Sequence, residues 1–317
     1  KLSIPDSLIG ATLMVTLKSS DSLVANNQMY IGGGYIPSAA HFDYAYGSPN
    51  YGNQQIIMAS VTDSVYYINV LSVSNGLNQN ITLKAEVLPF SIVSVDANSG
   101  GNSGNVTIRI IGSLFTNNMT ATLVKNATVI PATAIYYTNS TTVYATFNLQ
   151  GRPLGIYDVI LTKTDLSTAI LTNGFSVVNP NNGGLITGGG VNTGAGNGNQ
   201  PGCDPGAAAG LNSQLSIELV LPTHAFGGWP FPIQINYHNP TNNDIPAQTR
   251  VLYSVEHLPI ALTQSGFITA GSSLYLTLSG QEGPPGIIRA GGSGVIVVYS
   301  KAPVTYPAHA DANYIIK

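Results

Sequence analysis

The sequence predicts an all-β protein made of tandem β-sandwiches of the immunoglobulin-like type. Segments in which apolar and polar residues alternate recur along most of the chain, and they are rich in β-branched and aromatic residues. Gly, Asn and Pro separate them, and no window carries apolar residues at helical spacing. Short strands with turns between them are typical of sandwiches.

Each strand is assigned by this alternation, because a period of two places every second side chain on the same face of a sheet. In chain order, the predicted strands are residues 11–17, 65–71, 80–87, 92–95, 106–111, 142–147, 157–162, 215–220, 231–237, 274–278 and 294–299.

The strands group into three sandwiches, at residues 1–88, 89–179 and 213–317. Near residues 88–90 one strand ends and the next begins without a linker, so we predict a rigid junction there. Residues 180–212 are rich in Gly and Asn and offer few side chains that could anchor a core. We therefore predict a flexible linker between the second and third sandwiches.

Charge is scarce along the whole chain. Only 8% of residues are charged, with 11 Lys and Arg against 14 Asp and Glu and a net charge of -3, whereas about 25% is usual for soluble proteins. So few and scattered basic residues cannot neutralise a phosphate backbone, which excludes nucleic-acid binding. The apolar runs are strand-length and far shorter than the roughly 20 residues of a membrane helix.

The single cysteine and the low charge favour an extracellular or cell-surface location, because such a surface would be a solubility risk in the cytosol. Lys1 is not an initiator Met and no signal-type segment follows it, so we expect a processed or internal piece of a longer chain. Cys203 lies in the Gly/Asn-rich linker. It is either an incidental exposed thiol or the site of an intermolecular disulfide.

The first segment resembles the bacterial pre-peptidase C-terminal (PPC) domain, a secreted β-sandwich. The resemblance rests on Gln28 to Ile31, Gly33, Pro37, the Phe42-Asp43-Tyr44 triplet, Asn53 to Gln55, and Tyr66 to Val70. It differs from the family at Gln28, where an Asp is usual, and in the strands that normally precede Leu8, which are short or absent. The resemblance thus implies a sandwich that lacks its first strands, with an open sheet edge.

The second segment resembles an IPT/TIG domain of the immunoglobulin-like class. The residues that carry this resemblance are Ile92 to Val95, Asn98 to Gly101, Val106 to Ile108, Gly112 to Phe115, Thr141 to Phe147, Gly155 to Val159 and Asn173 to Phe175. The third segment resembles CARDB-like adhesion domains through the turn from Asn236 to Ala247. Domains of all three kinds are typically strung together in large bacterial surface and secreted proteins.

Two loops are candidate calcium sites, because Ca²⁺ prefers carboxylate and amide oxygens. One set is Asp43 with Asn50 and Asn53, and the other is Asp96 with Asn98 and Asn102. The competing interpretation is that these residues form Asx turns at strand ends. No other cofactor is expected.

Five Asn-x-Thr triplets are candidate N-glycosylation sites. They begin at Asn80, Asn105, Asn118, Asn126 and Asn139. Chance accounts for about as many triplets in a chain this rich in Asn, Ser and Thr, but all five fall in one region.

Tyrosines crowd one long loop and form one further pair, which makes them candidates for an interaction surface, since Tyr suits sugar stacking and protein interfaces. They are Tyr35, Tyr44, Tyr46, Tyr51, Tyr136 and Tyr137. The alternative is that these rings cover an open sandwich edge.

The chain carries no H-E-x-x-H or G-x-S-x-G motif, and its histidines are scattered, so we predict that it is not an enzyme. The first functional hypothesis is an extracellular structural or adhesive protein, part of a surface fibre, filament or sheath. It would associate with copies of itself or other surface proteins, through sandwich packing and strand addition. The tail with Tyr314, Ile315 and Ile316 is the candidate donor strand. The second hypothesis is a glycan- or calcium-dependent binding region of a secreted hydrolase.

Overall fold

The computed structural model describes residues 1–23, 25–47, 50–73, 78–181, 191–192, 215–267, 270–305 and 312–317. Most of the predicted linker lies outside the described residues. In the described part of the chain, no helix is long and apolar enough to cross a membrane.

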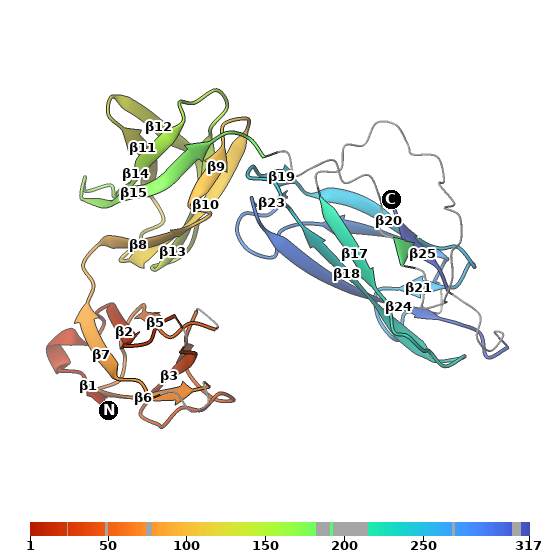
Figure 1. The fold of residues 1–317 in the computed structure, drawn as a ribbon, viewed down its shortest axis with the longest axis horizontal. Helices are drawn as coiled ribbons and strands as arrows, with labels where there is room; N and C mark the ends of the chain where they lie inside the picture. The colour runs from red at the N-terminus through yellow and green to blue at the C-terminus, as the bar shows by residue number, and fades with distance from the viewer. Residues whose placement is uncertain are drawn as a thin grey trace.

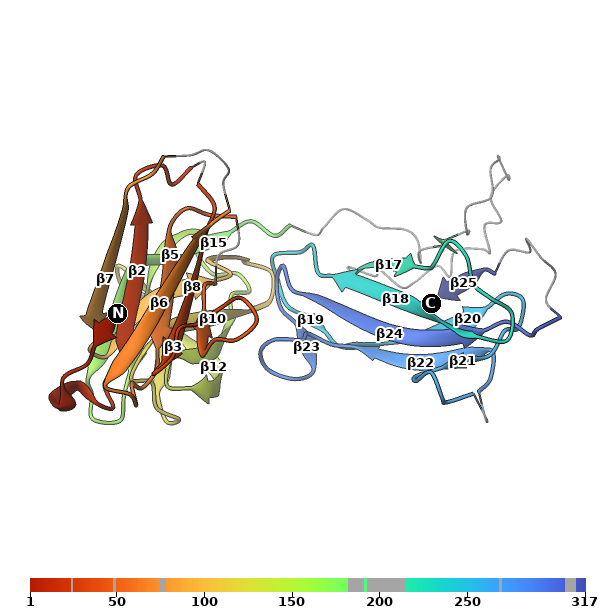
Figure 2. The ribbon, with the colours of Figure 1, turned by 90° about the horizontal axis from the view of Figure 1, so that it is seen from below.

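The all-β fold class is confirmed. The described residues form strands throughout, with one 3-10 turn, η1, at Asp6–Leu8. Figures 1 and 2 show three bodies of strands that follow one another along the chain. Every strand predicted from alternation is present within a few residues of its predicted bounds.

The first body has two facing sheets. One sheet has the order β1 (Leu2–Ser3), β6 (Val65–Ser72), β3 (Asn27–Gly33) and β4 (Tyr44–Ala45). The other has the order β5 (Gln54–Met58), β2 (Leu13–Ser19) and β7 (Ile81–Val87). Their inward side chains form one core that includes Val15, Leu17, Met29, Ile31 and Tyr66.

The second body is one continuous set of eight strands that wraps around a core. The order is β8 (Ser91–Asp96), β10 (Asn105–Ser113), β13 (Thr142–Asn148), β12 (Thr128–Asn139), β11 (Thr120–Lys125), β14 (Gly155–Thr162), β15 (Thr168–Val178) and β9 (Ser99–Gly101). Because β8 and β9 are consecutive in the chain, the two ends of the sheet meet. The break between them is at Ala97, which has a positive φ of 58°.

The third body again has two main sheets. One contains β16 (Val191–Asn192), β25 (Tyr314–Ile316), β20 (Gln248–Ser254) and β22 (Ser273–Leu278). The other contains β17 (Ser216–Val220), β18 (Pro230–His238), β24 (Ser293–Lys301) and β21 (Ile260–Ala261). A small pair, β19 (Ile245–Pro246) with β23 (Ile287–Ile288), extends at the end near the second body (Figure 1).

The junction between the first and second bodies is anchored on both sides. Leu88 is buried and its N–H donates to the Thr12 carbonyl oxygen in the first body at 2.9 Å. Phe90 lies edge-on to Phe115 of the second core, with ring centroids 6.4 Å apart. Pro89 is the one residue between them, and its carbonyl oxygen accepts hydrogen bonds from Ser91 and Ser113. The junction therefore has little freedom to bend.

Gly112 interrupts the ladder between β10 and β8 with a register shift. A Cβ at this position would collide with the Ser91 carbonyl oxygen and press on the Phe115 ring. Only glycine allows this bulge, which lets β10 bend while its side chains stay in the core.

We predict that Gly112→Ala lowers the free energy of unfolding by about 2 kcal/mol or more, because the backbone of β8 must move. Urea unfolding followed by tyrosine fluorescence measures this. Gly104→Ala is the matched control, since its Cβ would meet its nearest neighbour, an Asn243 atom, at 3.7 Å, an ordinary contact. Equal stability of the two variants would contradict the bulge argument.

Candidate functional site at the contact of the second and third sandwiches

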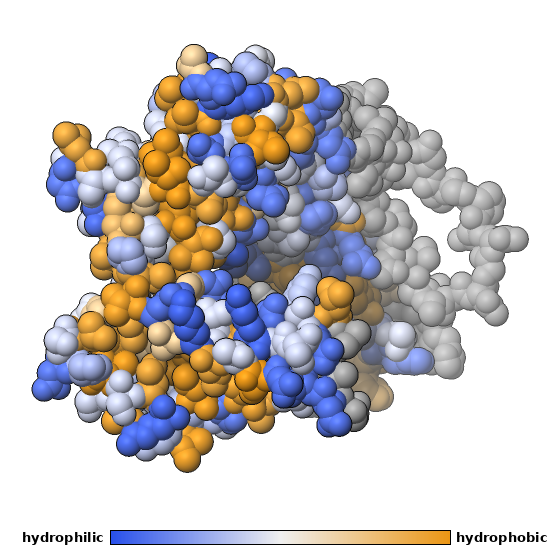
Figure 3. Space-filling model, turned by 60° about the vertical axis from the view of Figure 1, so that its left-hand side comes forward, coloured by the Kyte–Doolittle hydropathy of each residue, from blue (hydrophilic) through white to orange (hydrophobic). Residues whose placement is uncertain are grey.

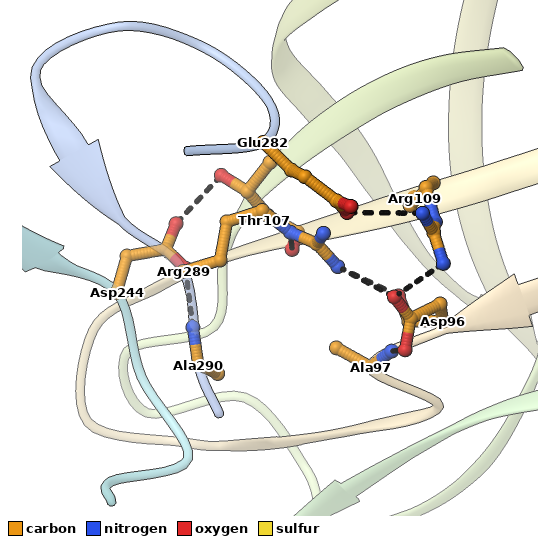
Figure 4. A network of polar contacts seen from close by, with 8 residues as sticks. All are labelled: Asp96, Ala97, Thr107, Arg109, Asp244, Glu282, Arg289 and Ala290. Atoms are coloured by element: carbon orange, nitrogen blue, oxygen red, sulfur yellow. Dashed lines mark hydrogen bonds and ion pairs between the residues drawn. The ribbon is translucent and has the colours of Figure 1, made fainter. Parts of the chain in front are cut away.

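The second and third bodies touch directly through polar groups. From the second body come the end of β8 and the start of β10. From the third come the loop before β19, the loop before β23 and the turn after β23. The sequence predicts a flexible linker between these two sandwiches and gives no sign of this direct contact. Figure 4 shows the charged part of this contact.

Asn239 shapes the contact loop of the third body. Its side chain is fully buried, and its amide nitrogen donates to the carbonyl oxygens of Asn243, Ile288 and Arg289 at 2.8–3.0 Å. Its amide oxygen accepts from the N–H and hydroxyl of Thr241. A buried amide with all its groups bonded fixes its loop, because breaking any of these bonds leaves a buried polar atom without a partner.

The fixed loop presents two asparagines to β9 of the second body. The Gly101 N–H donates to the Asn242 carbonyl oxygen at 2.8 Å, and the Asn243 amide donates to the Gly101 carbonyl oxygen at 2.8 Å. The Ser103 hydroxyl donates to the Asn243 amide oxygen at 2.9 Å. A Cβ on Gly101 would collide with both asparagine side chains. The close approach therefore requires glycine.

Arg289 crosses the contact from the third body. It is only 6% exposed. Its Nε donates to the Thr107 carbonyl oxygen and its Nη2 to the Asp96 carbonyl oxygen, both at 3.1 Å. Its guanidinium carbon lies 5.0 Å from the centre of the Tyr144 ring, and Nη2 lies 3.5 Å from the Asp96 carboxylate. A guanidinium suits this role because its flat array of donors bonds in several directions while its face stacks on an aromatic ring.

The charges at the contact alternate in sign. Asp96 lies between Arg289 and Arg109, whose Nη2 is 3.1 Å from the Asp96 carboxylate. Arg109 in turn lies between Asp96 and Glu282, at 2.9 Å. The network in Figure 4 thus joins two basic and two acidic side chains from both bodies. Each charge lies next to one of opposite sign. Arg289 is the buried member, while the Asp96 and Glu282 side chains are more than half exposed, so the cost of burial falls mainly on Arg289.

Asp244 adds a further carboxylate on the other side of Arg289. It accepts hydrogen bonds from the Thr107 hydroxyl at 2.6 Å and from the Ala290 N–H at 3.3 Å. Burial raises the pKa of the Asp244 carboxyl, while the bonds from Thr107 and Ala290 and the charge of Arg289 oppose this rise. Removal from water therefore has the largest effect on the pKa of the Asp244 carboxyl.

A cleft of about 710 Å³ lies at this contact. Asp96, Asn98 and Ser99 line it from the second body, and Glu282, Arg289 and Ser293 are among its residues from the third. The charged groups that line it are already committed to the ion pairs and hydrogen bonds above. The charged groups of the cleft therefore serve to hold the two sandwiches together.

Both predicted calcium sets stay predictions, and several of their side chains bond to other protein groups in the structure. The Asp96 Oδ2 atom pairs with Arg109 and Arg289, and its Oδ1 atom accepts a hydrogen bond from the Ala97 N–H. Asp43 accepts from the Gly33 N–H and the Tyr35 hydroxyl, whereas Asn53 accepts from the Ser19 N–H and Asn50 from the Asn26 amide. No group of three or more His, Cys, Asp or Glu suited to a metal ion is found among the described residues.

The predicted tyrosines lie in different surroundings. The Tyr35 ring lies against His41 with centroids 4.4 Å apart, and Tyr46 packs edge-on to Tyr30. Tyr44 packs against the first core, where burial, followed by the nearby Tyr66 and Asp43, raises the pKa of its hydroxyl. Tyr51 is exposed.

Tyr136 and Tyr137 are both partly exposed on β12 of the second body. Tyr136 neighbours Tyr144, the ring under Arg289. This pair therefore lies beside the contact between the second and third bodies, on a different body from the other tyrosines.

The five candidate glycosylation asparagines all have exposed side chains, so they stay predictions. They are Asn80, Asn105, Asn118, Asn126 and Asn139. Cys203 lies outside the described residues.

The predicted donor strand needs correction. Tyr314, Ile315 and Ile316 form β25, which pairs with β20 and β16 of its own sheet. Tyr314 is fully buried and its hydroxyl donates to Ser300 at 2.6 Å. Withdrawing this strand would open the third core, so the tail is a structural strand of its own body.

Sequence reasoning missed Arg289, Arg109, Glu282 and Asp244 as a group. Asp96 and Arg289 are 193 positions apart, and nothing in the local pattern links them. The sequence offers one local signal for Arg289. This residue follows the apolar pair Ile287-Ile288 and precedes Ala-Gly-Gly, a pattern that places it at the turn after a short strand.

Comparisons with known proteins give no family. No family model and no curated protein matches the chain. Among solved structures, a match is the Bacteroides ovatus mixed-linkage glucan utilization locus SGBP-B in complex with mixed-linkage heptasaccharide. It is 12% identical, with coverage of 94% of this chain and 96% of that chain and a TM-score of 0.23. At that TM-score we base no conclusion on it.

The raised pKa of Asp244 leads to a pH prediction. The folded state holds the proton more tightly than the unfolded state, so the stability this group contributes is complete at low pH and is lost as the pH rises through the raised pKa. We therefore expect Asp244→Asn to gain stability relative to the wild type as the pH rises, and then to level off. Urea unfolding across acidic and neutral pH measures the difference.

Asp165→Asn is the control of opposite sign. Hydrogen bonds from Ser167 lower the pKa of the exposed Asp165 carboxyl. The wild type should therefore gain relative to this variant as the pH rises. A difference between Asp244→Asn and wild type that does not change with pH would contradict the assignment.

Proposed function

We propose that this chain is an extracellular structural or adhesive protein, a segment of a surface fibre, filament or sheath. In it the second and third sandwiches act as one stiff unit. The observation that supports this most directly is the buried Arg289, which bonds across the contact to Thr107 and Asp96. A spacer must keep its modules at fixed positions, and a contact with several directed hydrogen bonds does this better than a tether alone.

The proposal extends to partners and chemistry. The partners are copies of this chain or other surface proteins. The chain itself is proposed not to be an enzyme. In support, the charged groups that line the cleft at the contact of the second and third bodies pair with one another or with backbone groups.

The test is the shape of the protein in solution. Arg289→Gln leaves Asp96 with one arginine and removes both backbone hydrogen bonds across the contact. We expect a loss of about 1–3 kcal/mol in the coupling between the two bodies. Small-angle X-ray scattering should then show a larger radius of gyration and a broader distance distribution.

Lys84→Gln is the matched control, since it also removes one positive charge but lies on the exposed strand β7 of the first body. Its scattering curve should equal that of the wild type. If Arg289→Gln also leaves the curve unchanged, the contact does not hold the two bodies together and the stiff-unit proposal fails.

A second candidate function, glycan binding, is favoured by one observation in the first body. Phe42, Tyr44 and Tyr66 line a cleft of about 540 Å³ together with Asp43 and Asp63. Phe42 is the exposed ring of the three and can stack on a sugar ring, whereas Tyr44 is half-buried and Tyr66 is buried. The two carboxylates beside Phe42 can accept hydrogen bonds from sugar hydroxyls.

We expect that any glycan retained by the protein on a glycan array is lost with Phe42→Ala, because Phe42 is 41% exposed at the cleft. The loss should be about tenfold or more in affinity. Tyr51→Ala, an exposed ring outside the cleft, is the control. An array without hits, or equal loss from both variants, would remove the glycan candidate.

A further inference from the structure

One end of the third sandwich carries a turn of large apolar residues and glycine. Residues 221–229 join β17 to β18, and within them Phe226, Gly227, Gly228 and Trp229 form the turn. The contact with the second body follows the other end of β18. Figures 1 and 2 both place the β17–β18 loop at the end of the third body that is turned away from the second. The turn therefore takes no part in the contact between these two bodies.

Hydrogen bonds and close packing hold this turn in one shape. The Trp229 N–H donates to the Phe226 carbonyl oxygen at 3.1 Å, and the Gly228 N–H donates to the Ala302 carbonyl oxygen at 2.7 Å. Gly228 has a positive φ of 83°, and a Cβ on it would collide with the Val304 side chain. Residues 226–229 and 303–304 thus pack together as one unit, the apolar tip.

The large side chains of the apolar tip are exposed to water. Phe226 is 83% exposed, Trp229 72% and Val304 81%. Trp229 is the one tryptophan of the chain, and tryptophan is on average a highly buried residue. Hydrophobic residues also occur on the face shown in Figure 3, where they are mixed with hydrophilic ones, as is ordinary for a protein surface. The tip differs because its side chains offer a single hydrogen-bonding group, the indole N–H.

Polar residues and one basic residue surround the base of the tip. They are Thr223, His224, Lys301 and Thr305. Lys301 lies opposite Pro230, directly after the turn. Residues 221–231 and 301–305 contain no Asp or Glu, so Lys301 is the only charged residue of these two segments. Glu256 is nearby in the fold, since Ser254 pairs with Tyr314 and Tyr314 bonds to Ser300, but both its carboxylate oxygens accept from Asn313.

We propose that the apolar tip docks the protein on a lipid bilayer that carries anionic headgroups. This inference goes beyond the assembly role proposed above. At a bilayer surface the rings of Phe226 and Trp229 reach the boundary of the acyl chains, while the indole N–H meets headgroups and water. Lys301 then lies at the level of the headgroups, where anionic lipid attracts its charge.

The chemistry and the place of the tip favour a bilayer over other partners. A sugar stacked on Trp229 would need several polar side chains that converge on its hydroxyls, and the tip does not offer them. A protein partner would need a pocket that matches a projecting turn, whereas a fluid bilayer adapts to it. The position at the end of the third body leaves a flat surface free access to the tip (Figures 1 and 2).

The single tryptophan is a direct probe of this docking. The whole chain is titrated with vesicles of equal parts phosphatidylcholine and phosphatidylglycerol while the emission of Trp229 is recorded. We expect a saturable shift of the emission to shorter wavelength, and quenching by lipids that are brominated on their acyl chains. Vesicles of phosphatidylcholine alone should bind about fivefold or more weakly, because the attraction of Lys301 is lost.

Phe226→Ser should weaken binding to the mixed vesicles about tenfold or more, because it removes a ring from the part that enters the bilayer. Its urea unfolding should equal that of the wild type, since the ring is exposed. Tyr275→Ser is the matched control, because Tyr275 is also an exposed ring, 74% exposed on β22 of the same body. It should bind as the wild type does.

Lys301→Gln tests the electrostatic part separately. It should weaken binding to the mixed vesicles about fivefold and leave binding to phosphatidylcholine vesicles unchanged. Lys84→Gln, which removes an exposed positive charge from the first body, is its control.

Three outcomes overturn the proposal. The emission of Trp229 does not change with vesicles, or Phe226→Ser and Tyr275→Ser weaken binding equally. Alternatively, Trp229 already emits at short wavelength and is shielded from acrylamide in the free protein, which means that protein covers the tip. Each outcome is independent of the scattering test on Arg289, which uses no lipid.

Discussion

A single buried guanidinium sets the relation between the second and third sandwiches. Arg289 is placed where water is excluded, so its donors must find acceptors on the protein. Most of those acceptors belong to the other body, namely the backbone oxygens of Thr107 and Asp96 and the Asp96 carboxylate. A displacement of one body against the other by a few ångströms would leave several of these groups unpaired at once. The contact therefore has one favourable geometry.

This contact offers a physical reason for the scarcity of charge along the chain. Two of the 11 basic residues, Arg109 and Arg289, lie within it. The remaining contacts use neutral groups, among them Asn242, Asn243 and Ser103. Removing amides and hydroxyls from water costs less free energy than removing ions. A surface made of these neutral groups is therefore suited to packing against other protein. The charged pairs of Arg109 and Arg289 lie where the two bodies must meet in one relative orientation.

The fold could be predicted from the sequence wherever a strand has one buried face, as in β10 and β18, because alternation records that burial. Alternation fails for β12, whose side chains are mostly exposed on both faces and which contains Pro131. The tail from Tyr314 to Ile316 is correctly predicted to be a strand. The prediction that it is donated to another chain is wrong, since the sequence pattern does not say which sheet it joins. The charged contact was out of reach because its partners are far apart in sequence, and its specificity comes from the fold.

The three sandwiches close their sheets in different ways. The third sandwich uses its last strand, β25, to complete its own sheet, and the second joins β8 to β9 so that its sheet ends meet. In the first, Leu83 of β7 pairs with the buried Leu17 and so faces inward, yet it is exposed. Leu88 and Phe90 hold the first body to the second with Pro89 alone between them. The three sandwiches are therefore linked by two restrained joints in series, one apolar at Leu88 and Phe90 and one polar at Arg289.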